Sequence, residues 1–179
     1  MHTLNQIFEK AREYNMEVWL LFIDFNKAFD SIFHDKTWLA LKSHNTPNCI
    51  IRVLQNLYNQ ASAYIKTEIK GKNFKICRGV KQGDPLSPVI FNSILEEVFQ
   101  KTDWEGKGIK VNGSWLNNLR FADDIVLIGK NVDKLKGMGE ELKTLCLEVG
   151  LELNLTKTKM MSNSEDKEFF LDNIKIEQV

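Results

Sequence analysis

Apolar residues recur along the chain at two spacings, and each spacing predicts a different element. Residues 3–15 carry apolar side chains at intervals of three and four, which predicts an amphipathic helix. Residues 17–25 (EVWLLFIDF) form a nearly continuous apolar run rich in aromatic and β-branched side chains, which is typical of a central strand buried on both faces. The unusual member of that run is Asp24, a carboxylate near its end.

The rest of the chain alternates between helical and strand patterns. Helical spacing predicts further helices over residues 35–44, 47–60, 88–101 and 133–149. Alternation of apolar and polar positions predicts strands over residues 61–69, 72–78, 115–121 and 125–129, with short closing strands within residues 160–179. This order of helices and hairpins predicts an α+β fold.

Local signals predict how some of these helices begin, end and face the core. Ser87 followed by Pro88 predicts a capping serine with proline at the first helical position. Gly150 predicts the end of the helix over residues 133–149. In the helix over residues 47–60 we expect one apolar face to point inward, formed by Ile50, Val53, Leu54 and Leu57.

Composition places the chain among globular proteins. Its 179 residues suit one domain, or a domain and a fragment, and 43% hydrophobic residues suffice for a core. The longest apolar runs, such as residues 18–23, are too short to span a membrane. The cysteines are far apart and lack zinc-binding spacing, which indicates reduced core thiols of an intracellular protein: Cys49, Cys77 and Cys146.

Charge is balanced overall and concentrated locally. The chain has 24 basic and 24 acidic residues, which counts against a nucleic-acid-binding protein because phosphate backbones select basic surfaces. One cluster departs from this balance, and it suits either contact with a nucleic-acid backbone or an ordinary solvated hairpin face: Lys66, Lys70, Lys72 and Lys75.

Three acids stand where the pattern predicts strand ends. Asp24 ends the buried run, and Asp123 and Asp124 connect two apolar strands. A buried carboxylate is costly unless it is paired or binds a metal, and oxygen ligands suit Mg²⁺ or Mn²⁺ rather than zinc. Taken alone, the adjacent pair is also typical of a solvated turn.

Four segments, in order, resemble the motifs of one enzyme family. Residues 22–30 (FIDFNKAFD) resemble motif A of reverse transcriptases, and residues 79–88 (GVKQGDPLSP) resemble motif B. Residues 121–124 (FADD) resemble motif C, and residues 150–159 (GLELNLTKTK) resemble motif D. Their order and spacing are similar to those of the non-LTR, LINE-type branch of retrotransposons.

The resemblance implies a fold and an activity. The fold would be a polymerase palm, an antiparallel sheet backed by helices with an Asp-Asp hairpin, with partial fingers and no thumb. Residues 1–179 would form one reverse transcriptase domain fragment. The activity would be RNA-directed DNA polymerisation, which transfers a nucleotide from a dNTP to the 3′-hydroxyl of a DNA primer paired with an RNA template. Fingers and thumb usually carry the basic surface, so their absence would explain the neutral charge and limit activity of the fragment alone.

The resemblance also implies ligands for two Mg²⁺ ions, with Mn²⁺ as a substitute. Asp24 and Asp123 would hold both ions, assisted by the Phe25 carbonyl. Asp124 would support them as a nearby acid. Lys157 would lie beside the departing pyrophosphate, where a cation neutralises charge or donates a proton. Lys159 is the rival for that role.

Five further residues would contact the incoming nucleotide. Lys27 and Ala28 would offer backbone amides to the triphosphate. Phe29 would lie under the sugar and exclude a 2′-hydroxyl, although core packing also explains a phenylalanine there. Gln82 and Gly83 would contact the nucleotide and the template near the new base pair.

Other readings of the sequence remain open at this stage. A group II intron maturase-like reverse transcriptase is a close relative, and its motif C usually has Tyr in place of Phe121. An RNA-dependent RNA polymerase also carries an Asp-Asp hairpin, but Phe29 disfavours it. A non-catalytic retrotransposon remnant is the alternative outside the enzymes. We expect an intracellular protein, in the nucleus or cytoplasm and without membrane association.

Overall fold

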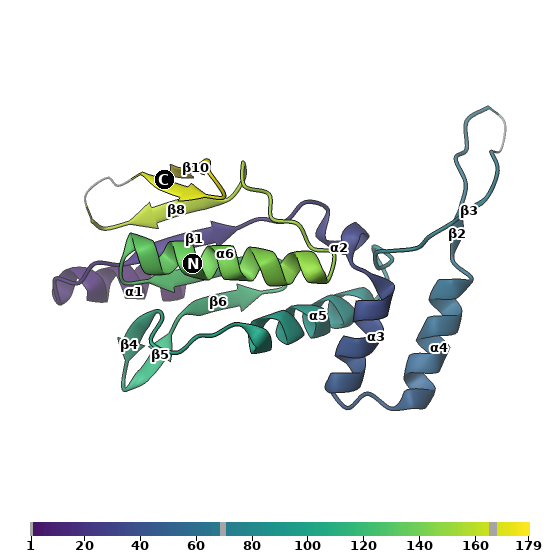
Figure 1. Cartoon of the computed structure of the whole chain (residues 1–179), viewed down its shortest axis with the longest axis horizontal. Coiled ribbons are helices and arrows are strands. Elements are labelled where there is room, and N and C mark those ends of the chain that lie inside the picture. The colour runs from purple at the N-terminus through teal and green to yellow at the C-terminus, as the bar shows by residue number, and fades with distance from the viewer. Residues whose placement is uncertain (1, 69–70, 165–167) are drawn as a thin grey trace.

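A mixed β-sheet forms the centre of the molecule (Figure 1). The computed structural model describes residues 2–68, 71–164 and 168–179. Neighbouring strands are antiparallel except β8 and β10, which are parallel. Within the described residues the sheet has six strands in the order β6 (Asn118–Phe121), β7 (Asp124–Gly129), β1 (Trp19–Ile23), β8 (Lys159–Ser162), β10 (Ile174–Gln178) and β9 (Phe169–Leu171).

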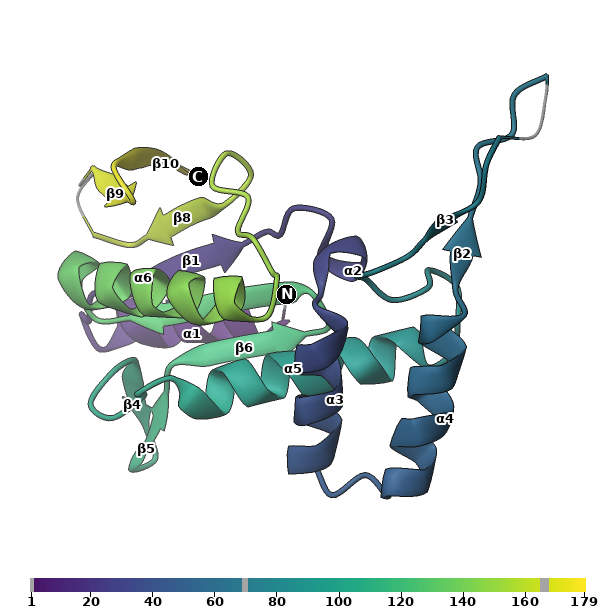
Figure 2. The same ribbon diagram turned by 45° about the vertical axis from the view of Figure 1, so that its right-hand side comes forward.

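Helices cover both faces of this sheet. On one face α1 (His2–Glu13) packs against the sheet, and its Ile7 joins Leu20 of β1 in an apolar cluster. On the other face α5 (Ser87–Lys101) and α6 (Val132–Glu148) bury Leu21 of β1 completely (Figure 2). Burial on both faces explains why the β1 sequence is a nearly continuous apolar run. The predicted α+β architecture, a largely antiparallel sheet backed by helices, is confirmed.

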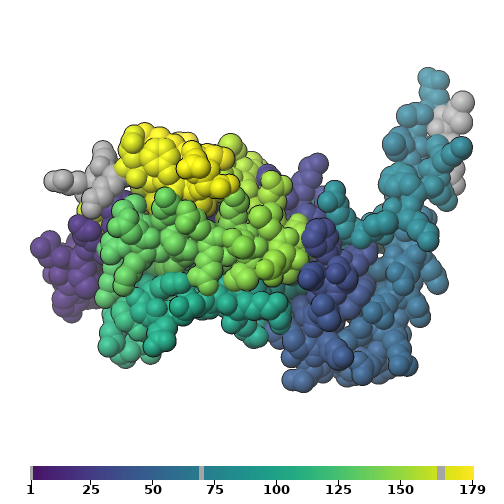
Figure 3. Space-filling view, viewed as in Figure 1, coloured from purple at the N-terminus to yellow at the C-terminus, as the bar shows by residue number. Residues whose placement is uncertain are grey.

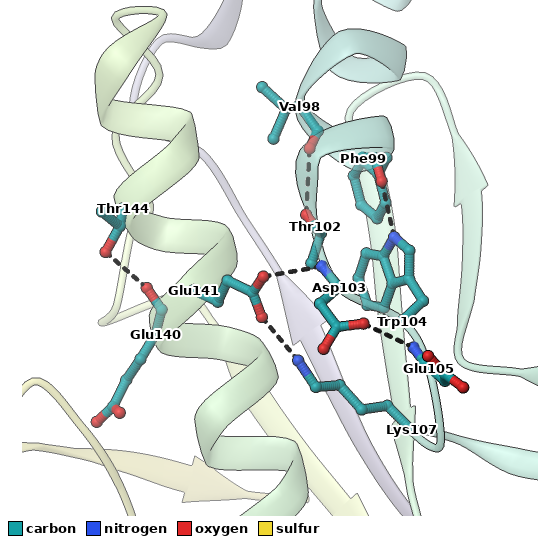
Figure 4. Close-up of polar contacts among 10 residues, drawn as sticks. All are labelled: Val98, Phe99, Thr102, Asp103, Trp104, Glu105, Lys107, Glu140, Glu141 and Thr144. Carbon is teal, nitrogen blue, oxygen red and sulfur yellow. Dashed lines mark hydrogen bonds and ion pairs between the residues drawn. The ribbon is translucent and has the colours of Figure 1, made fainter.

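Glu141 of α6 is hydrogen-bonded to the loop that follows α5 (Figure 4). Glu141 accepts a 2.9 Å hydrogen bond from the Asp103 amide and a 2.7 Å one from the Lys107 ammonium. Beside it, the Trp104 indole donates to the Phe99 carbonyl at 2.7 Å, and the two rings stack. These contacts fix the relative position of the two helices that cover one face of the sheet.

A helical hairpin extends from one end of the sheet. After the short α2 (Ala28–Ser31), α3 (His34–Ser43) packs on α5, and a short turn connects it to α4 (Asn48–Asn59). The Ser43 hydroxyl donates to Glu97 of α5 at 2.7 Å. That hydrogen bond lowers the pKa of the Glu97 carboxyl.

The inward face expected for α4 is wrong for most of its residues. Ile51 and Leu54 are buried against Leu41 of α3. The other apolar side chains of that face are between 49% and 60% exposed: Ile50, Val53 and Leu57. The physical reason is that α4 packs mainly on α3, so only a narrow stripe of its surface finds an apolar partner.

Two predicted hairpins differ from the structure. The strands expected over residues 61–69 and 72–78 shrink to β2 (Ser62–Ala63) and β3 (Phe74–Lys75), in a hairpin that stands away from the body (Figure 3). Residue 69 lies outside the described residues. A hairpin with no core to pack against gains little from longer pairing.

The stretch over residues 115–121 is broken at residue 117 rather than forming one strand. Its first part belongs to β5 (Ser114–Leu116), which pairs with the unpredicted β4 (Ile109–Val111). The two strands are joined by Asn112 and Gly113, which both have positive φ. The closing strands expected within residues 160–179 are present as β8, β9 and β10, although residues 165–167 lie outside the described part.

Of the two predicted helix boundaries, the end of α6 at Gly150 is confirmed and the cap at Ser87 is wrong. Gly150 ends α6 with φ +89°, and the Leu151 amide bonds back to the Cys146 carbonyl at 2.9 Å, as expected for a left-handed cap. Ser87 is not a cap. It is the first residue of α5, and its hydroxyl donates to the Lys81 carbonyl at 2.6 Å, while Asp84 accepts from the Leu86 amide.

The prediction of core thiols holds for one cysteine. Cys146 is fully buried, and burial raises the pKa of its thiol to about 12. Cys49 and Cys77 are exposed, so the prediction is wrong for both. Cys49 lies in the first turn of α4, and Cys77 follows the projecting hairpin. In the described part of the chain, every helix is too short or too polar to cross a bilayer.

Candidate active site

The predicted acids meet at one edge of the main sheet. Ile23, the last residue of β1, lies opposite Ile125 of β7 in antiparallel register. Continued by one residue, that register places Asp24 across from Asp124. Asp123 belongs to the two-residue turn between β6 and β7, and Asp124 is the first residue of β7. Residues far apart in the sequence are thereby brought together as the motifs predict.

The turn that carries the acid pair is strained. Phe121 pairs with Asp124, so Ala122 and Asp123 alone connect the strands. Ala122 has φ +51°, a left-handed conformation that costs a residue with a Cβ about 1–2 kcal/mol. Such strain persists where the surroundings hold it, and it clusters at functional sites. Here it places two exposed carboxylates at the tip of a short hairpin.

The acids differ in their surroundings. Asp24 is half-buried, and its Oδ1 is fully buried with no hydrogen-bond partner in the described part of the chain. Asp123 and Asp124 are exposed, because Asp123 lies in the turn and Asp124 is the first residue of β7 beside it. Among the described residues, no group of three or more His, Cys, Asp or Glu side chains is arranged to hold a metal ion. A buried carboxylate oxygen without a donor nevertheless suits a cation.

The backbone of Asp24 is held from one side by the segment that resembles motif D. The Asp24 carbonyl accepts from the Asn154 amide at 2.8 Å, and the Asp24 amide donates to the buried Thr158 hydroxyl at 3.4 Å. On the same side, the Asn26 amide donates to the Glu152 carbonyl at 2.8 Å. Successive carbonyls of an extended chain point opposite ways, so the Phe25 carbonyl is directed toward the β7 side, where the acid pair lies.

Sequence reasoning missed Asn154 and Thr158 as supports of the site. Asn154 does carry a recognisable signal, because asparagine often closes a turn on its own side chain. Its Oδ1 accepts from the Thr156 hydroxyl at 2.8 Å and from the Lys157 amide at 3.3 Å. No local pattern announces Thr158, whose partner is 134 residues away.

The start of α2 places two backbone donors close to Asp24 in the sequence. Lys27 adopts φ +47°, and Ala28 opens the helix. Among the described residues, neither amide donates a hydrogen bond. Phe29 is half-buried, and its ring stacks on Phe91 of α5 with centroids 4.7 Å apart. Core packing therefore explains one face of the Phe29 ring and fixes its orientation.

Backbone hydrogen bonds join the segment that resembles motif B to α2 and to the residue that follows it. The Gly79 amide donates to the Ile32 carbonyl at 2.7 Å, and the Val80 amide donates to the Phe29 carbonyl at 2.6 Å. Gly79 has φ +84°, and a Cβ there would lie 2.7 Å from the Asp30 carbonyl oxygen, so only glycine fits this approach. These contacts bring two of the predicted motifs into one surface.

The loop that follows presents the predicted nucleotide contacts. The Gln82 side chain donates to the Asp30 carboxylate at 3.1 and 3.3 Å. Gly83 has φ +82°, and a Cβ there would meet nothing within 4 Å. Gln82 is thus tethered beside α2, while Gly83 faces open space that another molecule can enter.

The structure distinguishes the two lysines proposed for the leaving group. Lys159 forms an ion pair with Glu177 of β10. Lys157 is exposed, and its ammonium has no partner within the described ranges. Lys157 therefore keeps its charge available.

Comparison with known proteins decides the family. The model for reverse transcriptase (RNA-dependent DNA polymerase) matches residues 1–171. This chain belongs to the reverse transcriptase family.

Relatives and solved structures agree with that assignment. The chain is 32% identical over 136 residues to the Pol polyprotein of retrotransposable element R2DM of Drosophila melanogaster, covering 75% of this chain and 13% of that protein. It is 28% identical to the R2 Pol polyprotein of Nasonia vitripennis, covering 84% and 15%. Telomerase from Candida tropicalis, bound to a telomeric RNA fragment, shares the fold with a TM-score of 0.68 at 18% identity, covering 98% of this chain and 31% of that one. The non-LTR resemblance and the palm-like fold are confirmed.

An aromatic cluster supports the motif B loop of this reverse transcriptase. Tyr58 of α4 packs edge-on against His34 and Trp38 of α3, with ring centroids 5.1 and 5.6 Å away. His34 Nε2 lies 2.8 Å from the Gly79 carbonyl oxygen. Burial raises the pKa of the Tyr58 hydroxyl. Sequence reasoning did not connect these residues with the segment at Gly79, because that segment is distant in the chain.

Proposed function

We propose that this chain forms the catalytic core of an RNA-directed DNA polymerase, which adds deoxynucleotides to a primer 3′-hydroxyl. The observation that carries the proposal is the meeting of Asp24 with the Asp123–Asp124 turn at one sheet edge. Residues 1–179 would make up a palm with part of the fingers. The chain spans 13% and 15% of the length of the two curated relatives.

The acidic edge fits divalent cations. Asp24 and Asp123, with the Phe25 carbonyl, would hold two Mg²⁺ or Mn²⁺ ions, and Asp124 would add negative charge beside them. The partnerless Oδ1 of Asp24 supports this assignment, because a cation satisfies a buried carboxylate oxygen. When bound, two such ions supply positive charge to the attacking and leaving oxygens of a phosphoryl transfer.

Residues around this edge would bind and orient the nucleotide. The unpaired amides of Lys27 and Ala28 would donate to the triphosphate, as backbone donors do in other phosphate sites. The Phe29 ring, held by Phe91, would close the space that a 2′-hydroxyl needs. Gln82 and Gly83 would lie against the new base pair and the template.

Lys157 would act on the departing pyrophosphate. It lies between Asn154 and Thr158, which both support the backbone of Asp24, and its ammonium is unpaired in the described chain. Its positive charge would offset the negative charge that develops on the leaving group, or its proton would pass to it.

The partners follow from the same proposal. A polymerase of this family would take an RNA template paired with a DNA primer, together with dNTPs. The telomerase relative is described as bound to a telomeric RNA fragment, which supports an RNA-binding role for this fold.

Primer extension tests the proposal. The chain is given a primed RNA template, dNTPs and Mg²⁺, and it is compared with Asp123→Ala and with Asp133→Ala as a matched exposed acid at the start of α6. We expect extension by the unmodified chain and the control, and none by Asp123→Ala. Phe29→Val should raise incorporation of ribonucleotides relative to deoxynucleotides by roughly tenfold or more. Activity that survives Asp123→Ala contradicts the proposal.

A further inference from the structure

The hairpin that projects from the body is the most basic part of the chain. Residues 61–78, which we name the basic arm, contain five basic residues and one acid, whereas the whole chain has 24 of each. Its net charge of +4 is therefore balanced by a net charge of −4 over all other residues. The arm is the exception to the neutral composition that argued against nucleic-acid binding. Its basic residues are Lys66, Lys70, Lys72, Lys75 and Arg78, and the position of Lys70 lies outside the described residues.

The cations of the arm are not neutralised by the protein. Lys66, Lys72 and Lys75 are exposed, and within the described part of the chain none of them forms an ion pair or a side-chain hydrogen bond. Elsewhere in that part of the chain, lysines pair readily with acids, as Lys107 does with Glu141 at 2.7 Å. Unpaired cations on a projecting arm can neutralise phosphates, and the counterions that the polyanion then releases favour its binding.

Apolar side chains are interleaved with these cations. They contact no core of the protein, although exposing them to water is unfavourable. Tyr64 is 45% exposed, Ile65 67%, Phe74 52% and Ile76 39%. An aromatic ring beside lysines is the combination that single-stranded nucleic acids use, because bases stack on the ring while phosphates meet the cations.

The base of the arm leads directly into the nucleotide site. Arg78 pairs with Phe33 in an isolated bridge, and Gly79 and Val80 are hydrogen-bonded to α2. Gln82 follows four residues after Arg78. Figures 2 and 3 show the arm rising from the end of the molecule where α2 and the motif B segment lie. A polynucleotide that leaves the site on this side would therefore pass along the arm.

We propose that the basic arm binds single-stranded nucleic acid, namely the unpaired stretch of the template ahead of the nucleotide site. The inference rests on the proposed polymerase function for the direction of the strand, but the contact itself needs only phosphates and bases. Lys66, Lys72 and Lys75 would meet the backbone, and Phe74 would stack on a base.

Fluorescence anisotropy with an unstructured oligonucleotide tests the arm directly. Binding of the whole chain to a labelled single-stranded RNA is measured against salt concentration in metal-free buffer. The variant combines Lys66→Gln, Lys72→Gln and Lys75→Gln. The control removes the same charge from the far ends of α5 and α6 with Lys101→Gln, Lys134→Gln and Lys136→Gln, which are also exposed.

The arm variant should lose about tenfold or more in affinity, and the slope of log affinity against log salt should fall by about 2, because each lost phosphate contact removes about 0.7. The control should lose threefold or less. Phe74→Leu should weaken binding roughly tenfold while the salt slope stays unchanged, since stacking releases no counterions. Parallel titrations with RNA and DNA of the same sequence show which template the arm accepts.

Equal losses in the arm variant and the control overturn the inference, as does an unmodified chain that binds neither oligonucleotide at low salt. The latter result would leave the arm as a surface for a protein partner. Failure of the polymerase proposal is read separately, from primer extension by the Asp123→Ala series. Since the binding assay contains no metal and no dNTP, the arm can bind when extension fails, and extension can occur when the arm does not bind.

Discussion

The carbonyl of Asp24 accepts a 2.8 Å hydrogen bond from the amide of Asn154. This contact joins the strand end that carries the first proposed metal ligand to the segment that carries Lys157. Asp24, which would bind the ions, and Lys157, which would act on the leaving group, therefore lie on two segments that are hydrogen-bonded to each other. The proposed site would therefore depend on backbone contacts at this junction as well as on the acidic side chains.

Thr158→Val tests that junction. The variant keeps the shape of a fully buried side chain but removes the hydroxyl that accepts from the Asp24 amide at 3.4 Å. Loss of one such hydrogen bond is worth about 0.5–1.5 kcal/mol, so dNTP incorporation should fall roughly threefold to tenfold. Thr144→Val, which removes an exposed hydroxyl that is hydrogen-bonded within α6, should leave incorporation unchanged. An unchanged rate in Thr158→Val would show that this contact does not position Asp24.

Gly79→Ala tests the close approach between motif B and α2. Gly79 and Gly113 have nearly the same φ, +84° and +87°, but only at Gly79 would a Cβ collide with backbone, 2.7 Å from the Asp30 carbonyl oxygen. In urea unfolding, Gly113→Ala should cost about 1–2 kcal/mol through its φ alone. Gly79→Ala should cost at least about 2 kcal/mol more, because two main chains must separate. Equal costs would mean that the approach is not tight.

A second pair of glycines lies on α6, two residues apart. Gly137 faces open space, whereas a Cβ on Gly139 would lie 3.0 Å from Leu171 Cδ1 and 3.1 Å from Leu21 Cδ2. Gly137→Ala should raise the free energy of unfolding by about 0.5–1 kcal/mol through helix propensity. Gly139→Ala gains the same benefit but crowds a packed core, so it should be about 1–3 kcal/mol less stable than Gly137→Ala. Equal stabilisation by both changes would argue against close packing of α6 on the sheet.

The sequence was sufficient for the parts of the molecule that local patterns determine. The apolar run of β1, the helices α1, α5 and α6, and the cap at Gly150 all follow from spacing and from glycine geometry. The meeting of the acids at one edge of the sheet was predictable from the motifs, because Asp24 follows the apolar strand β1 and Asp124 begins the apolar strand β7. The β4–β5 hairpin was also within reach, because Asn112-Gly113 is a strong signal for a tight turn.

Other features depend on neighbours that the sequence does not specify locally. The spacing of apolar residues predicts that the exposed face of α4 is buried, because spacing alone does not show how many other helices or strands will pack against a helix. The hydrogen bond from Asp24 to Thr158 and the contact of His34 with Gly79 join distant positions, so no window of sequence contains both partners.

The thiols give a test of the core that does not depend on activity. Burial raises the pKa of Cys146 from its ordinary value of 9.0 to about 12, so the folded state retains the proton that the unfolded chain releases. The stability contributed by this neutral thiol is complete below pH 9 and is lost as the pH rises from 9 toward 12. In the folded protein at pH 8, a thiol reagent should label the exposed Cys49 and Cys77 and should reach Cys146 only after unfolding. Equal labelling rates for all three thiols would contradict the packing of α6.

The most direct test of the central claim is Mn²⁺ binding at the acidic edge, measured by electron paramagnetic resonance in the presence of a dNTP. The unmodified chain and the exposed-acid control Asp133→Asn should bind the ion equally, because Asp133 lies at the start of α6. Asp24→Asn and Asp123→Asn should each weaken binding by about tenfold or more, because each removes a charged oxygen ligand. Equal Mn²⁺ affinity in all four proteins, or no binding by the unmodified chain, would contradict the account.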